Sequence, residues 1–130
     1  MHLARSNAII SIFADDDLTG KEGQFVRMSS NTAVALMDSG LDTPLGLLLI
    51  GGKTNERVTV AIPGGLAGTV RVKLAGEAYI GSRLQLTNDG RVMAHDNEFP
   101  RIIVGVALEA GVTGELIEAS LCTATYTPAG

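Results

Sequence analysis

The chain repeats one pattern of apolar and polar residues twice. Residues 22–38 (EGQFVRMSSNTAVALMD) align without a gap with residues 80–96 (IGSRLQLTNDGRVMAHD). After one inserted residue, 44–62 (PLGLLLIGGKTNERVTVAI) align with 103–121 (IVGVALEAGVTGELIEASL). The coinciding glycines are Gly23 and Gly81, Gly46 and Gly105, and Gly52 and Gly111. An internal repeat indicates one supersecondary unit built twice, and it constrains the fold more than any single motif does.

Each copy has the pattern of four short strands. Apolar and polar residues alternate in 57–62 and 117–121, which is the period of a strand with one buried face. Asn88-Asp89-Gly90 predicts a tight hairpin turn, because Asp-Gly tolerates positive φ angles. The runs LGLLLI (45–50) and IIVGVAL (102–108) do not alternate, which predicts strands covered on both faces. Short strands separated by glycine turns predict an all-β fold, a small β-barrel or sandwich.

The remaining segments lie outside the two copies. PGGLAGTVRVKLAGEA (63–78) is interpreted as a crossing segment with one shared strand. AIISIF (8–13) belongs to neither copy; this apolar segment must close the barrel or pair with a neighbour, because an uncovered edge strand aggregates. We expect an N-terminal arm (1–17), a β-barrel domain (18–123, with pseudo-repeats at about 22–62 and 80–121) and a C-terminal tail (124–130).

Composition excludes several classes of protein. The 130 residues suffice for one compact core, and 4% aromatic content without Trp makes that core aliphatic. The net charge of -4 with scattered Lys and Arg argues against nucleic-acid binding. A single cysteine, Cys122, excludes a disulfide framework, and we expect it to be buried and inert. We expect a soluble protein, since the sequence shows no signal peptide and no apolar run near the roughly 20 residues of a membrane span.

The polar residues do not form a recognisable catalytic pattern. His2 and His95 lack metal-ligand spacing, and Cys122 has no nearby histidine in the sequence. Glu56 and Glu115 occupy matched positions of the two copies, where we interpret them as surface charges. A catalytic acid needs an apolar cleft to raise its pKa, and few aromatic residues are present to line one. We therefore expect no enzyme activity, no cofactor and no metal.

The acidic stretch ADDDLTGKEG (14–23) is the best candidate for a cation site. Its first half has the alternating oxygens and the glycine of a calcium loop. The residues concerned are Asp15, Asp17, Thr19 and Gly20. The second half fails, because Val26 stands where a bidentate Glu is required. We interpret the stretch as a solvated acidic turn, and the glycines of PGGLAG (63–68) likewise as turn residues.

The order of these motifs resembles a known family. LTGKEGQFVRM, PLGLLLIGG, ERVTVAIPGGLAGTVRVKLAG, GSRLQLTNDGRV and IIVGVALEAGVTGELIEASL follow one another as in the small capsid cement, or head decoration, proteins of tailed bacteriophages. The resemblance covers about residues 18–121. It consists of structural glycines and aliphatic positions, so no functional residue can be carried over from the family.

The resemblance implies a structural virion protein with a β-barrel or β-tulip fold. Such a protein binds the outer surface of the expanded phage head and clamps neighbouring major capsid proteins together. It is made in the host cytoplasm, contacts neither nucleic acid nor membrane, and forms a symmetric oligomer, for which we favour a homotrimer over a homodimer.

An apolar arm ahead of a closed barrel suits strand addition to a neighbouring subunit. On this physical argument alone we expect capsid contacts from five residues of the arm: Leu3, Arg5, Ile9, Ile10 and Phe13. Removal of residues 1–13 is expected to leave the barrel folded and to abolish binding. The alternatives are another phage structural component, of the tail or a spike, and a small ligand- or carbohydrate-binding β module. The scarcity of aromatic residues counts against sugar binding, which stacks the sugar ring on Trp or Tyr.

Overall fold

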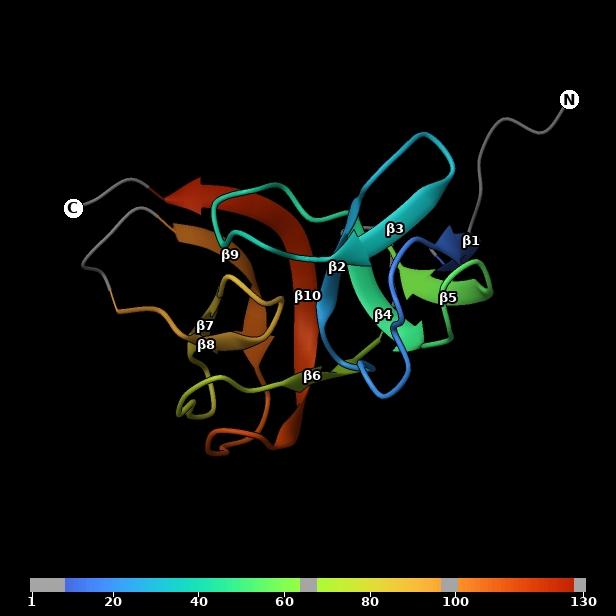
Figure 1. Cartoon of the computed structure of the whole chain (residues 1–130). Helices are drawn as coiled ribbons and strands as arrows, with labels where there is room; N and C mark the ends of the chain where they lie inside the picture. The colour runs from blue at the N-terminus through green and yellow to red at the C-terminus, as the bar shows by residue number, and fades with distance from the viewer. Residues whose placement is uncertain (1–8, 64–67, 97–100, 128–130) are drawn as a thin grey trace, which may run out of the picture.

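The computed structural model describes residues 9–63, 68–96 and 101–127. Their regular structure is all-β, as the sequence predicts (Figure 1). The strands are β1 (Ile9–Ala14), β2 (Phe25–Met28), β3 (Ala33–Leu36), β4 (Gly46–Ile50), β5 (Arg57–Ala61), β6 (Val70–Lys73), β7 (Arg83–Leu86), β8 (Val92–Ala94), β9 (Arg101–Ala107) and β10 (Leu116–Thr127). The first five close a barrel in the order β1-β3-β2-β4-β5, and the others form a sheet in the order β6-β10-β9-β7-β8.

The two copies found in the sequence have the same topology. The order β3-β2-β4-β5 in the first unit recurs as β8-β7-β9-β10 in the second. The register agrees as well: Met28 pairs with Val34 in the β2–β3 hairpin, and Leu86 pairs with Val92 in the β7–β8 hairpin. The repeat read from the sequence is therefore a repeat of structure.

Each unit has one strand more than the sequence indicated. β1 runs antiparallel to β5, and β6 runs antiparallel to β10 in the same way. The ends of these strands reach the equivalent hairpins in parallel, Ala14 beside Val34 and Leu74 beside Val92. Two interpretations drawn from the sequence are wrong, namely that AIISIF lies outside both copies and that the TVRVKL strand is shared. AIISIF contains β1, the first strand of the first unit, and TVRVKL contains β6, the first strand of the second unit.

β1 closes the first barrel, which is one of the two alternatives left open for this segment. Its last residue, Ala14, is buried and Ile12 packs against the barrel core. Residues 9–14 of the expected arm are thus a barrel strand, and residues 1–8 lie outside the described part of the chain. The expectation that a protein lacking residues 1–13 keeps its barrel conflicts with this arrangement, because β3 and β5 would both lose a partner.

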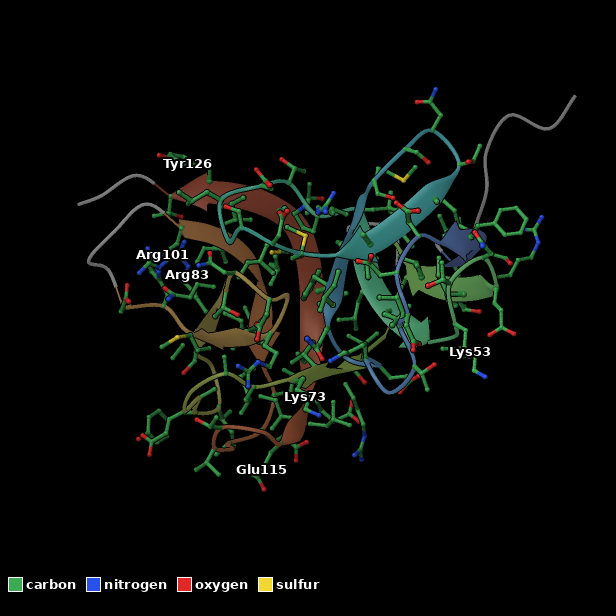
Figure 2. The ribbon with its side chains drawn as sticks, viewed as in Figure 1. Lys53, Lys73, Arg83, Arg101, Glu115 and Tyr126 are labelled. Atoms are coloured by element: carbon green, nitrogen blue, oxygen red, sulfur yellow. The ribbon has the colours of Figure 1, made fainter. Side chains whose placement is uncertain are left out.

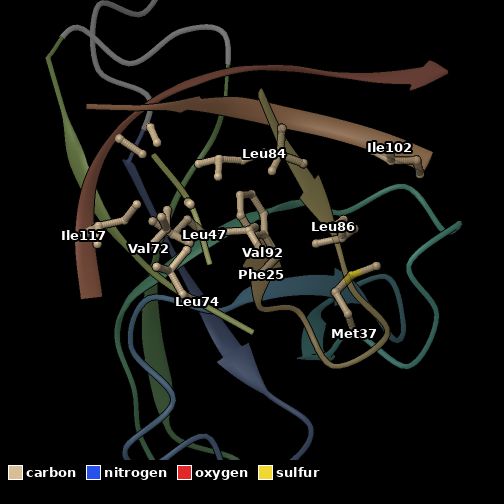
Figure 3. Packing of buried hydrophobic residues seen from close by; sticks show 14 residues of the cluster. Phe25, Met37, Leu47, Val72, Leu74, Leu84, Leu86, Val92, Ile102 and Ile117 are labelled. Carbon is tan, nitrogen blue, oxygen red and sulfur yellow. The ribbon is translucent and has the colours of Figure 1, made fainter. Parts of the chain in front are cut away.

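Two apolar clusters form the core. The smaller one fills the first barrel. The larger one, drawn in Figure 3, lies against the second sheet. Consecutive residues of β2 and β4 point into different clusters. Phe25 and Leu47 belong to the larger cluster, and Val26 and Leu48 belong to the smaller one. Strand β4 is therefore covered on both faces, which explains why the run LGLLLI does not alternate.

The second sheet is completed by a segment of the first unit. The backbone N–H of Lys73 on β6 donates to the carbonyl of Gly23 (2.9 Å), and the N–H of Phe25 donates to the carbonyl of Gly90 beside β8 (2.8 Å). Gly90 has a φ of 87°, and a Cβ there would lie 2.5 Å from the Phe25 carbonyl oxygen. Only glycine permits this approach. Residues 23–25 thus lie between β6 and β8, with the Phe25 ring in the second core.

Candidate interaction surfaces

The matched glutamates Glu56 and Glu115 cap equivalent turns. Glu56 Oε1 accepts a hydrogen bond from the Lys53 N–H (2.7 Å), and Glu115 Oε1 accepts one from the Val112 N–H (2.8 Å). A carboxylate that satisfies a turn N–H stabilises that turn whatever else the protein does. The repetition of this pair is explained by the fold.

The acidic turn after β1 is organised by its own hydrogen bonds. Asp17 Oδ1 accepts a hydrogen bond from the Thr19 N–H (3.0 Å). The side chain and backbone of Thr19, with Lys53 and Lys21 nearby, hold the pKa of Asp17 below its ordinary value. Among the residues that the structure describes, no three of His, Cys, Asp and Glu are grouped as metal ligands. These hydrogen bonds are those of an acidic turn, which is the interpretation given to residues 14–23 from their sequence.

A group of polar side chains lies at a pocket of about 310 Å³ beside the β7–β8 hairpin. Gln85 is buried there, and its Oε1 accepts a hydrogen bond from the Asp96 N–H (3.2 Å) and lies 3.0 Å from His95 Nδ1. Arg101 forms an ion pair with Asp96 (3.4 Å). These groups satisfy one another, so His95 has a structural role as a partner of Gln85.

Cys122 is half-buried rather than fully buried, and burial raises the pKa of its thiol. A raised pKa disfavours the thiolate, which is the reactive form of cysteine. None of the described segments forms a helix with the length and apolar character needed to span a bilayer.

Of the five expected contact residues, three can be placed. Ile9, Ile10 and Phe13 lie on β1, whereas Leu3 and Arg5 fall outside the described residues. Side chains alternate along a strand, so Ile9 and Phe13 share the outer face of the barrel while Ile10 lies on the opposite side of β1. Ile9 is 43% exposed and Phe13 is 42% exposed.

The outer face around β1 includes two residues that sequence reasoning missed. The guanidinium of Arg57 lies 4.5 Å from the centroid of the Phe13 ring, a cation–π contact. Ile50, 62% exposed, is brought close through β5, because β5 pairs with both β1 and β4. We call Ile9, Phe13 and Ile50 the β1 face. The end of the LGLLLI run was the only sequence signal for Ile50.

The repeat shows that the fold does not require apolar residues on the β1 face. By register, the equivalent positions in the second unit are polar. Ile9, Phe13 and Ile50 correspond to Thr69, Lys73 and Glu109. The same five-stranded unit therefore folds with polar residues there. Exposed apolar side chains that the fold does not need are typical of a surface that binds another molecule.

Comparison with known proteins identifies the fold. No protein-family model and no curated protein matches the sequence. Among solved structures, the chain is similar to the head fiber gp8.5 N base of bacteriophage phi29, with a TM-score of 0.63 over 90% of this chain and 97% of that chain. The chain shares its fold with a phage head fibre base. At 13% sequence identity the likeness is one of fold, and it agrees with the small β-barrel sandwich predicted from the sequence.

Proposed function

We propose that the protein is a structural component of a tailed-phage virion that binds the outer surface of the expanded head and clamps neighbouring major capsid proteins. The observation that carries the proposal is the fold shared with a head fibre base over nearly the whole of both chains. The sequence resemblance to capsid cement proteins, over residues 18–121, supports the same role independently.

The β1 face supplies a suitable contact surface. Its apolar side chains stand on paired barrel strands, so binding orders little additional backbone. Three exposed side chains give a modest contact by themselves. Many such contacts over a symmetric shell raise the overall strength of binding through avidity. A homotrimer suits the three-fold positions of such a shell, and it is part of the proposal.

A second candidate is the base of a head fibre. It is favoured by the name of the structural neighbour, a head fiber N base, of which this chain covers 97%. In this second candidate the chain attaches a fibre to the head, and no clamping of neighbouring capsid proteins is proposed. The two candidates therefore differ in whether binding strengthens the shell.

The test uses expanded, undecorated heads of the phage that encodes the protein. We expect saturable binding together with a higher temperature of head disruption. Saturable binding with no change in that temperature would favour the fibre base. Absence of saturable binding would refute both candidates, and binding to a glycan array would then favour the ligand-binding module.

The same assay tests the β1 face. The variant Ile9→Thr/Phe13→Lys/Ile50→Glu carries the residues of the second unit and has the same net charge as the parent. We expect it to fold and to bind heads at least tenfold more weakly. Tyr126→Thr, which removes another exposed apolar side chain (59%), is the matched control and should bind like the parent.

A further inference from the structure

The second unit has a distinct apolar surface at one end. It is formed by residues 75–82, between β6 and β7, and residues 108–115, between β9 and β10, at the lower left of Figure 1. Ala78 and Gly111 exchange backbone hydrogen bonds (3.1 and 3.0 Å), and the Gly81 N–H donates to the Ala107 carbonyl (2.8 Å). These bonds fix the two segments side by side. We call them the tip.

Large apolar side chains are exposed at the tip. Ile80 is 74% exposed, Tyr79 62%, Val112 53% and Leu108 44%. The four residues lie on two segments that are hydrogen-bonded side by side, so they are gathered at one end of the second unit. Tyrosine and aliphatic residues in such an area are typical of the centre of a protein interface.

The first unit shows that the turns do not need these residues. The Gln24 N–H donates to the Lys21 carbonyl just as the Ser82 N–H donates to the Tyr79 carbonyl, so Lys21 and Glu22 stand where the second unit has Tyr79 and Ile80. Lys53 likewise stands where the second unit has Val112, because each N–H is capped by the glutamate three residues later. Charged residues satisfy the same turns in the first unit. The fold therefore does not require Tyr79, Ile80 and Val112 to be apolar.

The charges at the tip are all negative. Residues 75–82 and 108–115 contain Glu77, Glu109 and Glu115 but no Lys, Arg or His. Glu77 accepts a hydrogen bond from the Tyr79 hydroxyl (3.0 Å), and Glu109 accepts one from the Glu118 N–H (2.7 Å). These bonds hold carboxylates beside the apolar area. Two cations flank the tip on the adjoining strands: Arg83, which follows Ser82 at the start of β7, and Lys73 on β6, which pairs with Leu116.

We propose that the tip is a second docking surface and that its partner is a protein surface with an apolar centre bordered by Lys or Arg side chains. Opposite charges on the two borders favour the encounter and fix the orientation. The tip of a second copy is a poor occupant, because a two-fold contact between two tips brings three glutamates against three glutamates.

If the proposed function holds, this partner is the major capsid protein, and this part of the inference rests on it. The tip and the β1 face belong to different units and lie at different sides of the molecule, the tip at the lower left and β1 at the right of Figure 1. One chain thus presents two contact surfaces, as a clamp between two neighbouring subunits requires.

The experiment replaces the tip residues by their counterparts in the first unit. The variant is Tyr79→Lys/Ile80→Glu/Val112→Lys, whose net charge rises by one. Its control is Tyr126→Lys, which has the same charge change and removes the only other tyrosine, at the opposite end of β10 from Glu115 (Figure 2). Circular dichroism and thermal unfolding establish that both variants fold.

We expect the tip variant to bind expanded heads at least tenfold more weakly than the parent and the control to bind within about twofold of it. A photoreactive amino acid at position 80 should crosslink to the major capsid protein, at a site bordered by Lys or Arg. If the parent and the tip variant bind equally well, the inference is wrong while the proposed function stands. Crosslinking to a second copy overturns the assigned partner. If the parent itself does not bind, the proposed function fails, and the tip inference fails with it.

Discussion

Phe25 tests whether the two units fold as one body. It belongs to β2 of the first unit, yet its side chain is fully buried in the core of the second. Val26, the next residue, is also fully buried but points into the first barrel. The variants Phe25→Ala and Val26→Ala therefore perturb different cores from adjacent positions of one strand.

The expected losses follow from the atoms removed. Phe→Ala in a packed core costs about 4 kcal/mol of unfolding free energy, because it removes the ring and leaves a cavity. Val→Ala removes two carbons, at about 0.8 kcal/mol each, and the cavity raises the cost to about 2 kcal/mol. With a urea dependence of about 2 kcal/mol per M, the midpoints should fall by about 2 M and about 1 M respectively.

The assay is urea unfolding followed by two signals. The chain has two tyrosines, Tyr79 and Tyr126, and both belong to the second unit. Tyrosine fluorescence therefore reports on the second unit alone, whereas far-UV circular dichroism reports on both. Because residues 23–25 complete the second sheet, we expect one transition by both signals in every variant.

The informative result is the effect of Val26→Ala on tyrosine fluorescence. Val26 contributes to the first core only, so an unchanged fluorescence midpoint beside a lowered circular dichroism midpoint would show that the units unfold separately. Two resolved transitions in the parent would lead to the same conclusion. Either outcome would refute the idea that residues 23–25, by completing the second sheet, make the two units unfold together.

Three further outcomes are expected. Gly105→Ala should destabilise the protein by about 2 kcal/mol in urea unfolding, because the new Cβ would lie 2.5 Å from the Ser120 carbonyl oxygen. The control is Gly52→Ala, which should lower stability far less, because the atom nearest to its new Cβ would lie 3.4 Å away. Asn55 has a φ of 70°, and Gly114 occupies the equivalent position in the second unit. Asn55→Ala should therefore lower the free energy of unfolding by about 1 kcal/mol, whereas Asn55→Gly should leave it nearly unchanged. Equal losses of stability in the two variants would contradict this expectation. Partial burial raises the pKa of Asp89, but hydrogen bonds from Thr87 and Arg91 outweigh burial and hold this pKa below its ordinary 3.8. Their stabilisation is present above pH 3.8 and is lost as the pH falls through the lower folded pKa, so Asp89→Ala should lower Tm at pH 7 and the difference from the parent should vanish in acid.

Most of the strand arrangement follows from periodicity. The non-alternating runs gave the doubly covered strands β4 and β9, and Asn88-Asp89-Gly90 forms the turn between β7 and β8. The first strand of each unit escaped notice for a physical reason. The turn that follows it is two residues shorter in the second unit, and the outer-face residues differ in polarity. Only the inward positions still match: Ile10 with Val70, Ile12 with Val72 and Ala14 with Leu74.

The candidate surface was less predictable than the fold. Ile9 and Phe13 were expected from an apolar N-terminal segment, and the structure places both on one exposed face. Ile50 and Arg57 reach that face through strand pairing between residues distant in sequence, which no local pattern encodes. The tip residues Tyr79 and Val112 were missed for the same reason.

The duplication separates residues that the fold requires from residues that it leaves free. Gly23 and Gly81 are alike in both units, each with a φ near 90° and each donating to the strand carbonyl opposite, so glycine is required there. The β1 face and the tip differ reciprocally: the first is apolar only in unit one, and positions 79, 80 and 112 of the tip are apolar only in unit two. Two identical apolar surfaces on each chain would favour indiscriminate self-association. With one surface of each kind, a single chain has two chemically different ends, and the proposed clamp uses both of them.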